Sequence, residues 1–212
     1  MRSLIIGLTA MLAACSSQSN EPSAFEQAQS LFTQDELVTN RFAAIAQTPR
    51  PILQVGLIDA GTSGNMLLEA RDGRYERYLS PDASSIILED GFLHSMFGFG
   101  EGLMGVEISE NRALVFSGRN GWADRIHTYL GGDDRTTFRT YRCAIANQGS
   151  DEVALLRGTI TTRRMAEACR NAEHNFVNLY WIDESRGEIV QSRQWAGPNL
   201  GAVSTRRAGV PQ

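Results

Sequence analysis

A hairpin near the C-terminus constrains the fold more than any other stretch of this chain. Two runs rich in aromatic and β-branched residues, at 176–183 and 188–198, flank the polar loop Glu184-Ser185-Arg186-Gly187. The closing glycine can adopt the left-handed conformation that follows a type I turn in such loops. The predicted cross-strand pairs are Asp183 with Glu188, Trp181 with Val190, and Tyr180 with Gln191.

The two faces of this hairpin are both partly apolar. Because side chains alternate between the faces of a strand, one face is predicted to carry Leu179, Trp181 and Val190. The opposite face is predicted to carry Tyr180, Ile182, Ile189 and Trp195. A hairpin with one solvated face shows a clearer alternation, so we expect cover on both sides, as in a small barrel or sandwich.

Many short candidate strands separated by turn signals precede the hairpin. Asp72-Gly73 and Asp90-Gly91 are tight-turn signals, and the Gly-rich run 98–105 is interpreted as a mobile loop. Little room remains for crossover helices, so we predict a mainly β fold, an antiparallel barrel-like or sandwich domain. The candidate strands are 52–58, 65–70, 75–79, 86–89, 92–96, 114–117, 125–130, 137–146 and 153–161.

The segment 24–47 predicts an N-terminal helix, broken once, that packs on the sheet. Phe25, Ala28, Leu31 and Phe32 recur at helical spacing. Acidic residues outnumber the single arginine of this segment, which disfavours a membrane-surface helix. Residues 24–212 are therefore assigned to a single β-rich domain with this helix at its start.

The beginning of the chain indicates export and lipidation. Arg2 precedes a short apolar run, which is followed by Leu12-Ala13-Ala14-Cys15. The run is shorter than the roughly 20 residues that span a bilayer. We interpret residues 1–14 as a lipoprotein signal peptide, Cys15 as the lipidated residue, and 15–23 as a polar tether. The alternatives are an ordinary secretory signal with a chance cysteine, or a buried helix. Ser16 directly follows the lipidated cysteine. Lipoproteins without aspartate at that position are generally sorted to the outer membrane, so we expect this location.

Two further cysteines, Cys143 and Cys169, remain after lipidation. In an exported protein this pair predicts a disulfide, which is worth about 3.5 kcal/mol for a loop of this length. It would join the strand around Arg142 to the polar segment 163–173. The alternative is a pair of buried free thiols.

Composition and motif spacing exclude several functions. The formal net charge of −4 argues against nucleic acid as a partner. Residues 100–105 match G-x-G-x-x-G, but short strands surround them instead of the βαβ unit that a nucleotide site needs. His94, His127 and His174 are scattered without ligand spacing. We therefore predict no cofactor, no metal site and no catalytic residues.

The hairpin also carries a family resemblance. The motif consists of Tyr180-Trp181-Ile182-Asp183, Gly187, Ser192-Arg193-Gln194-Trp195 and Gly197-Pro198. It resembles the C-terminal signature of the YjbF/GfcB family of bacterial lipoproteins. The resemblance implies a β-barrel-like domain anchored in the outer membrane, facing the periplasm and encoded with machinery for exopolysaccharide or group 4 capsule production. It implies no catalytic residues.

These observations predict a non-enzymatic lipoprotein that assists assembly or export of a surface polysaccharide, by contact with the polysaccharide or with export-machinery proteins. The alternatives are a lipocalin-like carrier of a small apolar ligand and a polysaccharide-trimming enzyme. The candidate contact surface consists of Tyr180, Gln191, Arg193 and Trp195, on the face opposite Trp181. For Trp195 the alternative is simple packing under the N-terminal helix.

Overall fold

A single antiparallel sheet dominates the computed structural model, which describes residues 41–100, 102–132 and 135–209. Residues 41–46 are helical, and α2 (Ser109–Ser117) lies between β6 and β7. No helix within these ranges is long and apolar enough to cross a membrane. The strands are β1 (Ile52–Leu57), β2 (Thr62–Asp72), β3 (Tyr75–Leu79), β4 (Ser85–Glu89), β5 (Phe92–Phe97), β6 (Gly102–Glu107), β7 (Gly121–Leu130), β8 (Thr136–Leu155), β9 (Gly158–Arg170), β10 (Asn175–Asp183), β11 (Glu188–Gly197) and β12 (Gly201–Gly209).

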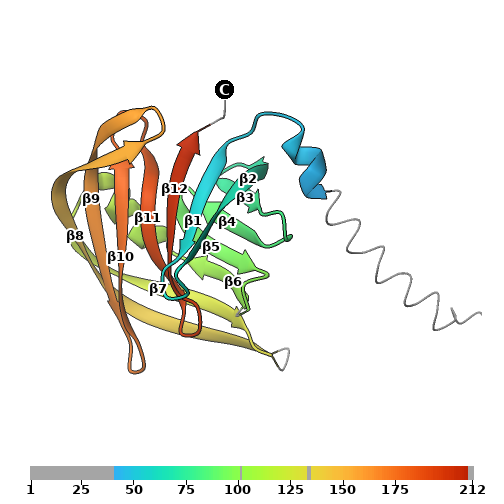
Figure 1. Cartoon of the computed structure of the whole chain (residues 1–212). Helices are drawn as coiled ribbons and strands as arrows, with labels where there is room; N and C mark the ends of the chain where they lie inside the picture. The colour runs from blue at the N-terminus through green and yellow to red at the C-terminus, as the bar shows by residue number, and fades with distance from the viewer. Residues whose placement is uncertain (1–40, 101, 133–134, 210–212) are drawn as a thin grey trace, which may run out of the picture. The chain divides into compact units, whose positions relative to one another are not determined.

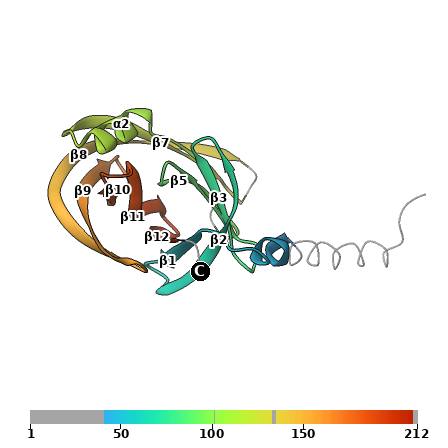
Figure 2. The same ribbon diagram turned by 90° about the horizontal axis from the view of Figure 1, so that it is seen from above.

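The twelve strands follow one another around a nearly closed barrel (Figure 1). Each strand pairs with its neighbour in the chain, except that β5 and β6 are the two edges of the sheet and that β1 pairs with β12. β5 and β6 lie side by side, so the sheet curls back on itself, and Figure 2 shows this curvature from above with α2 alongside β7 and β8. The predicted mainly β, antiparallel, barrel-like fold is confirmed.

The turn of the C-terminal hairpin forms as its sequence predicts. Gly187 has a φ of 65°, and its N–H donates to the carbonyl of Asp183 at 2.8 Å. The left-handed glycine closes the loop, so Asp183 pairs with Glu188. The first predicted pair of the hairpin is therefore confirmed.

From Trp181 onward the predicted register is wrong. Ile182 pairs with Ile189, but Trp181 pairs with Gln191, which leaves Val190 as the extra residue of a β-bulge. Tyr180 consequently pairs with Ser192. The bulge has a clear physical reason, since it allows the consecutive apolar side chains of Ile189 and Val190 both to be buried. The residues that follow exchange faces relative to the prediction.

Three other segments differ from their predicted structure. The Gly-rich run is partly a strand, since Leu103 and Val106 of β6 both reach the core through a bulge at residue 104. Residues 114–117 belong to α2, which ends at Gly118 in the left-handed conformation. The polar segment 163–173 largely belongs to β9. Its many polar residues did not indicate a strand, although its inner face is buried.

The interior of the barrel is filled by side chains. Phe92 and Tyr180 meet there with ring centroids 4.7 Å apart, and Val115 of α2 joins the same cluster. A lipocalin-like carrier needs a spacious apolar interior, and this packing is the opposite arrangement. The buried cluster includes Leu53, Val55, Met66, Tyr78, Ile86, Leu88, Leu93, Met96, Ile145, Met165, Ile182 and Val203.

Candidate binding groove on the outer face of the barrel

A polar ladder crosses the outer face of six adjacent strands. Side chains that are opposite each other in a sheet stand on the same face, so the strand register places these residues in one row. The successive pairs are Asn65 with Gln54, Gln54 with Arg206, Arg206 with Gln191, Gln191 with Trp181, and Trp181 with Arg164. Five strand spacings of about 4.8 Å give this ladder a length of about 24 Å.

A row of small residues beside the ladder forms the floor of a groove. Ser63, Gly56 and Ser204 follow one another across β2, β1 and β12. A Cβ at Gly56 would lie 2.6 Å from the hydroxyl oxygen of Ser204, so a larger residue there would force that hydroxyl to turn away. The groove above this floor has a volume of about 630 Å³.

One end of the groove is formed by the indole of Trp181. Its Nε1 donates to the Asp151 carboxylate at 2.9 Å, and the same oxygen accepts a bond from Arg164 at 3.1 Å. The hydrogen bond from Trp181 and the charge of Arg164 lower the pKa of Asp151. These contacts fix the ring at its edge. Its orientation is therefore set before any ligand arrives.

The groove offers hydrogen-bonding groups of several kinds. Gln54 and Asn65 have exposed side chains for which the described residues provide no partner. Arg206 donates from Nε to Gln191 Oε1 at 2.7 Å, and Arg193 donates to a backbone carbonyl of β10 at 3.0 Å. Amides that both donate and accept, next to fixed guanidinium groups, suit a ligand that is rich in hydroxyl groups.

The described lining of the groove contains no carboxylate, imidazole, phenol or thiol. Hydrolysis of a glycosidic bond requires a pair of groups that move protons or attack carbon. The described lining residues of the groove do not include such a pair.

The predicted contact residues divide between two environments. Gln191 and Arg193 lie in the groove, and Trp181, which was predicted to face away from them, lies beside them. Tyr180 is fully buried inside the barrel, so its assignment to the contact surface is wrong. The cause is the bulge at Val190, which reverses the phase of β11 relative to the prediction.

Trp195 is half-buried and lies outside the groove. Its ring stacks on Phe176 with centroids 5.4 Å apart and lies 6.2 Å from the ring of His174. One face of the indole is thus covered by the barrel itself. The predicted packing under the N-terminal helix stays a prediction, because most of that helix lies outside the described residues, as does Cys15.

Tyr180 belongs to a sealed charge cluster in the core, in which Glu167 is the centre. The Glu167 carboxylate accepts hydrogen bonds from Arg125 at 2.9 Å, Asn178 at 2.8 Å, Tyr180 at 2.7 Å and Asn111 at 2.6 Å. Burial alone would raise the pKa of Glu167, but Arg125 and these donors outweigh it and hold the pKa below its ordinary value.

A histidine extends this cluster. Arg125 Nε lies 2.8 Å from His127 Nε2, and His127 Nδ1 lies 2.8 Å from the hydroxyl of Tyr129. A guanidinium only donates, so Nε2 accepts and the imidazole is neutral with its proton on Nδ1. Burial, together with the charge of Arg125, holds the pKa of His127 well below its ordinary value.

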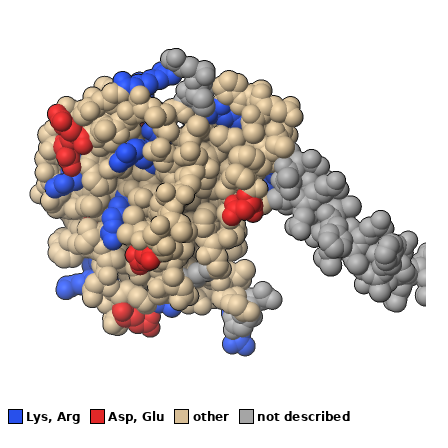
Figure 3. Space-filling model, viewed as in Figure 1, with Lys and Arg blue, Asp and Glu red and all other residues tan. Residues whose placement is uncertain are grey.

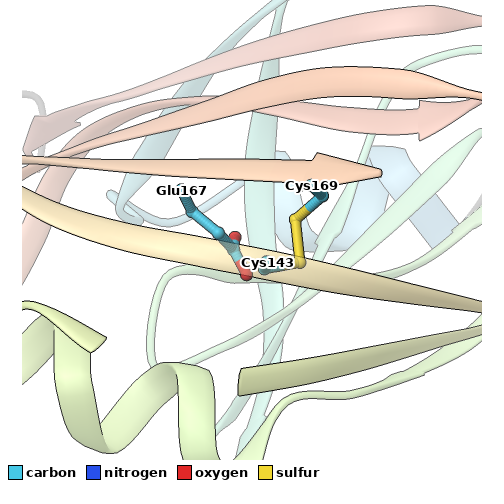
Figure 4. Close-up of side chains that lie close together, drawn as sticks. All are labelled: Cys143, Glu167 and Cys169. Carbon is cyan, nitrogen blue, oxygen red and sulfur yellow. A yellow bond between two sulfur atoms is a disulfide. The ribbon is translucent and has the colours of Figure 1, made fainter. Parts of the chain in front are cut away.

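The structure contains the disulfide between Cys143 and Cys169, which face each other across β8 and β9. Figure 4 shows Glu167 and Cys169 projecting from the same strand, with Cys143 opposite. A carboxylate beside two sulfur atoms resembles a metal-ligand set. The sulfurs are bonded to each other, however, and a metal requires thiolates, so this trio does not fit a metal site.

Charged side chains are dispersed on the face of the molecule seen in Figure 3. Isolated basic and acidic groups are separated by neutral surface, and no continuous basic field covers this face. Such a surface suits recognition by hydrogen bonds and ring contacts more than attraction of a highly charged polymer.

A nearly closed antiparallel barrel, with a filled interior and a polar groove outside, defines the structural class of this protein. A family model described as group 4 capsule polysaccharide lipoprotein gfcB, YjbF, matches residues 25–207. The chain belongs to this family, as its C-terminal motif predicted.

The fold is shared with a solved structure. The crystal structure of the hypothetical lipoprotein YmcC from Escherichia coli (K12) is 17% identical in sequence and superposes with a TM-score of 0.67. The match covers 92% of this chain and 98% of that chain. No curated protein matches the chain.

Proposed function

We propose that this protein is a non-catalytic lipoprotein of the outer membrane that binds a polysaccharide during assembly or export of a capsule or exopolysaccharide. Its family is named for capsule polysaccharide. The proposed anchor is a lipid on Cys15, supported by the Leu12-Ala13-Ala14-Cys15 motif. In this proposal the barrel faces the periplasm and also meets proteins of the export machinery.

The observation that carries the proposal is the groove across β2, β1, β12, β11 and β10. It combines an indole, amides and hydroxyls with a lining free of carboxylate and imidazole. Sugar rings present apolar C–H faces and hydroxyl edges, which match the indole and the amides respectively. A ladder about 24 Å long fits several consecutive sugar residues better than a single one.

Two rival functions have less support. A carrier of a small apolar ligand would need space that is occupied by the barrel's own side chains. A polysaccharide-trimming enzyme would need two carboxylates beside the bound chain, and the groove lining supplies neither.

The test is binding of oligosaccharides prepared from the host's surface polysaccharide to the purified protein, measured by calorimetry. The double variant Gln54→Ala, Asn65→Ala removes two exposed amides with no protein partner among the described residues, so it should unfold like the wild type. We expect its Kd for the oligosaccharide to rise at least tenfold, which corresponds to a loss of ~1.4 kcal/mol of binding free energy.

The matched control is Trp122→Ala, which removes an exposed indole outside the groove. It should leave affinity unchanged, whereas Trp181→Ala should weaken binding. Equal affinity in the wild type, the double variant and Trp181→Ala would reject the groove as the binding site.

A further inference from the structure

A second pocket opens at the end of the barrel where β12 finishes. It is lined by the start of β1, the turn between β10 and β11, and the tip of the β8–β9 hairpin. Its volume of about 450 Å³ lies within the usual range of ligand pockets, about 300–1,000 Å³. It shares no lining residue with the outer groove.

The back wall of this pocket is a cluster of two arginines on one buried carboxylate. Arg207 Nη2 lies 2.6 Å from Glu76 Oε2, and Arg71 Nε lies 3.1 Å from Glu76 Oε1. Arg207 also donates to the hydroxyl of Tyr78 at 3.2 Å. Burial raises the pKa of Tyr78 to about 12, so its hydroxyl stays neutral. One positive charge of the two guanidinium groups is left without a counter-charge in this cluster.

The rim adds further basic groups. Arg157 and Arg186 line the pocket from the hairpin tip and the β10–β11 turn, and the Arg186 side chain is 72% exposed. Arg186 Nε lies 3.8 Å from Asp183 Oδ2, and Glu188 also lines the pocket. Asp183 is engaged by Ser185, whose hydroxyl donates to it at 2.6 Å. Together with the back wall, the arginines still exceed the acids by one, so the pocket favours an anion.

The remaining walls are apolar. Ile52, Val190 and Ile160 line the side of the pocket, and Leu156 at the hairpin tip lines it while remaining 71% exposed. An inorganic anion gains nothing from such walls. A carboxylate attached to a ring uses both halves of the pocket, because the ring covers apolar surface while the acid meets guanidinium groups.

We propose that this pocket binds one acidic sugar residue, a pyranose carrying a carboxylate, at an end or branch of the polysaccharide. This inference rests on the proposed function for the source of the sugar. The pocket of about 450 Å³ takes a single residue, whereas the groove with its ladder of about 24 Å takes a run of residues.

The test is titration of the full-length protein in detergent with methyl glucuronide, methyl glucoside and inorganic phosphate, followed by NMR. We expect glucuronide to bind at least tenfold more tightly than glucoside, and to weaken as salt is raised. The double variant Arg157→Ala, Arg186→Ala should lose at least tenfold in glucuronide affinity while its unfolding is unchanged.

The matched control is Arg142→Ala, whose partner Asp124 lies on the outer surface away from the pocket. Equal binding of glucuronide and glucoside, or an unaffected double variant, overturns the proposal. Binding of phosphate without glucuronide overturns the assignment of a sugar. The groove variant Gln54→Ala, Asn65→Ala should still bind glucuronide, so failure of the groove and failure of the pocket give different results.

Discussion

Two of the arginine–glutamate clusters in the barrel share a chemistry and differ in position. In the core, Arg125 and Glu167 are both 0% exposed, and four donors surround the carboxylate. At the end of the barrel, Glu76 is buried but its partner Arg71 is 56% exposed. The pKa of each carboxyl is lowered despite burial, which raises it, because arginines and hydrogen bonds stabilise the ionised form.

The two clusters differ in whether their charges can be reached by solvent. The core cluster has no access to solvent. Removal of either charged partner therefore leaves the other charge unpaired in a low-dielectric interior. In the cluster at the barrel end Arg71 is largely exposed, so water replaces part of any contact that Arg71 loses. The sealed cluster should therefore govern stability, and the open one should govern binding.

The largest expected effect is that of breaking the sealed pair. Glu167→Gln leaves the Arg125 charge buried without a counter-charge, which should cost about 3–5 kcal/mol of unfolding free energy. Denaturant unfolding with a fixed m-value would measure this. The exposed pair Arg142 and Asp124 is the control, and its loss should cost at most ~1 kcal/mol. Similar losses from both variants would refute the distinction.

The disulfide beside the sealed cluster should have the next largest effect. Replacing both Cys143 and Cys169 by serine should cost about 2–4 kcal/mol, because the unfolded chain gains freedom. The native pairing of β8 with β9 should persist, since Ile145 and Glu167 still pair nearby. Thermal unfolding of the oxidised, reduced and double-serine proteins measures this. Reduction without any change in Tm would contradict it.

Breaking the open cluster should have a smaller effect. Glu76→Gln removes the shared acceptor of Arg207 and Arg71, and we expect a loss of about 1–3 kcal/mol. Arg71 can turn to solvent, which limits the cost. The unfolding free energies of Glu76→Gln and Glu167→Gln, measured side by side, show which cluster contributes more to stability. A larger loss for Glu76→Gln would reverse the roles that we assign to the two clusters.

The smallest expected effect is on how the unfolding free energy depends on pH, which should change gradually as the pH is lowered. His127 has a folded pKa well below 6.5, so protons bind the unfolded state first and stability falls as pH drops below 6.5. The lowered pKa values of Glu167 and Glu76 contribute stability that is present above 4.5 and is lost as pH falls through the folded values. Both glutamine variants should therefore have a shallower acid limb, seen in unfolding curves from pH 7 to 3. An acid limb that is unchanged in both would contradict this assignment.

Local chemistry made the fold class and the turn of the hairpin predictable. The turn depends only on the left-handed conformation of Gly187, which a glycine adopts readily. That turn brings Asp183 and Glu188 opposite each other. The candidate site was less accessible. Gln191 and Arg193 lie in the proposed groove, as does Trp181, whereas Tyr180 lies on the inner face. Gln54, Asn65 and Arg206 also line the groove and were not among the predicted contact residues. Gln54 stands between two apolar neighbours in β1, and this alternation is the signal that would have placed it on the outer face.

The antiparallel β class, the turn at Gly187 and the family were predictable from the residues alone, and a lipid anchor at Cys15 stays a prediction. These features depend on residues that are neighbours in the chain. Only the tertiary structure decided the bulge at Val190, since the gain comes from burying Ile189 and Val190 together against the rest of the core. It also decided the ladder from Asn65 to Arg164 and the pairing of Arg125 with Glu167, which join strands far apart in sequence. Such contacts follow from closure of the barrel, because register across each strand pair accumulates around the whole sheet.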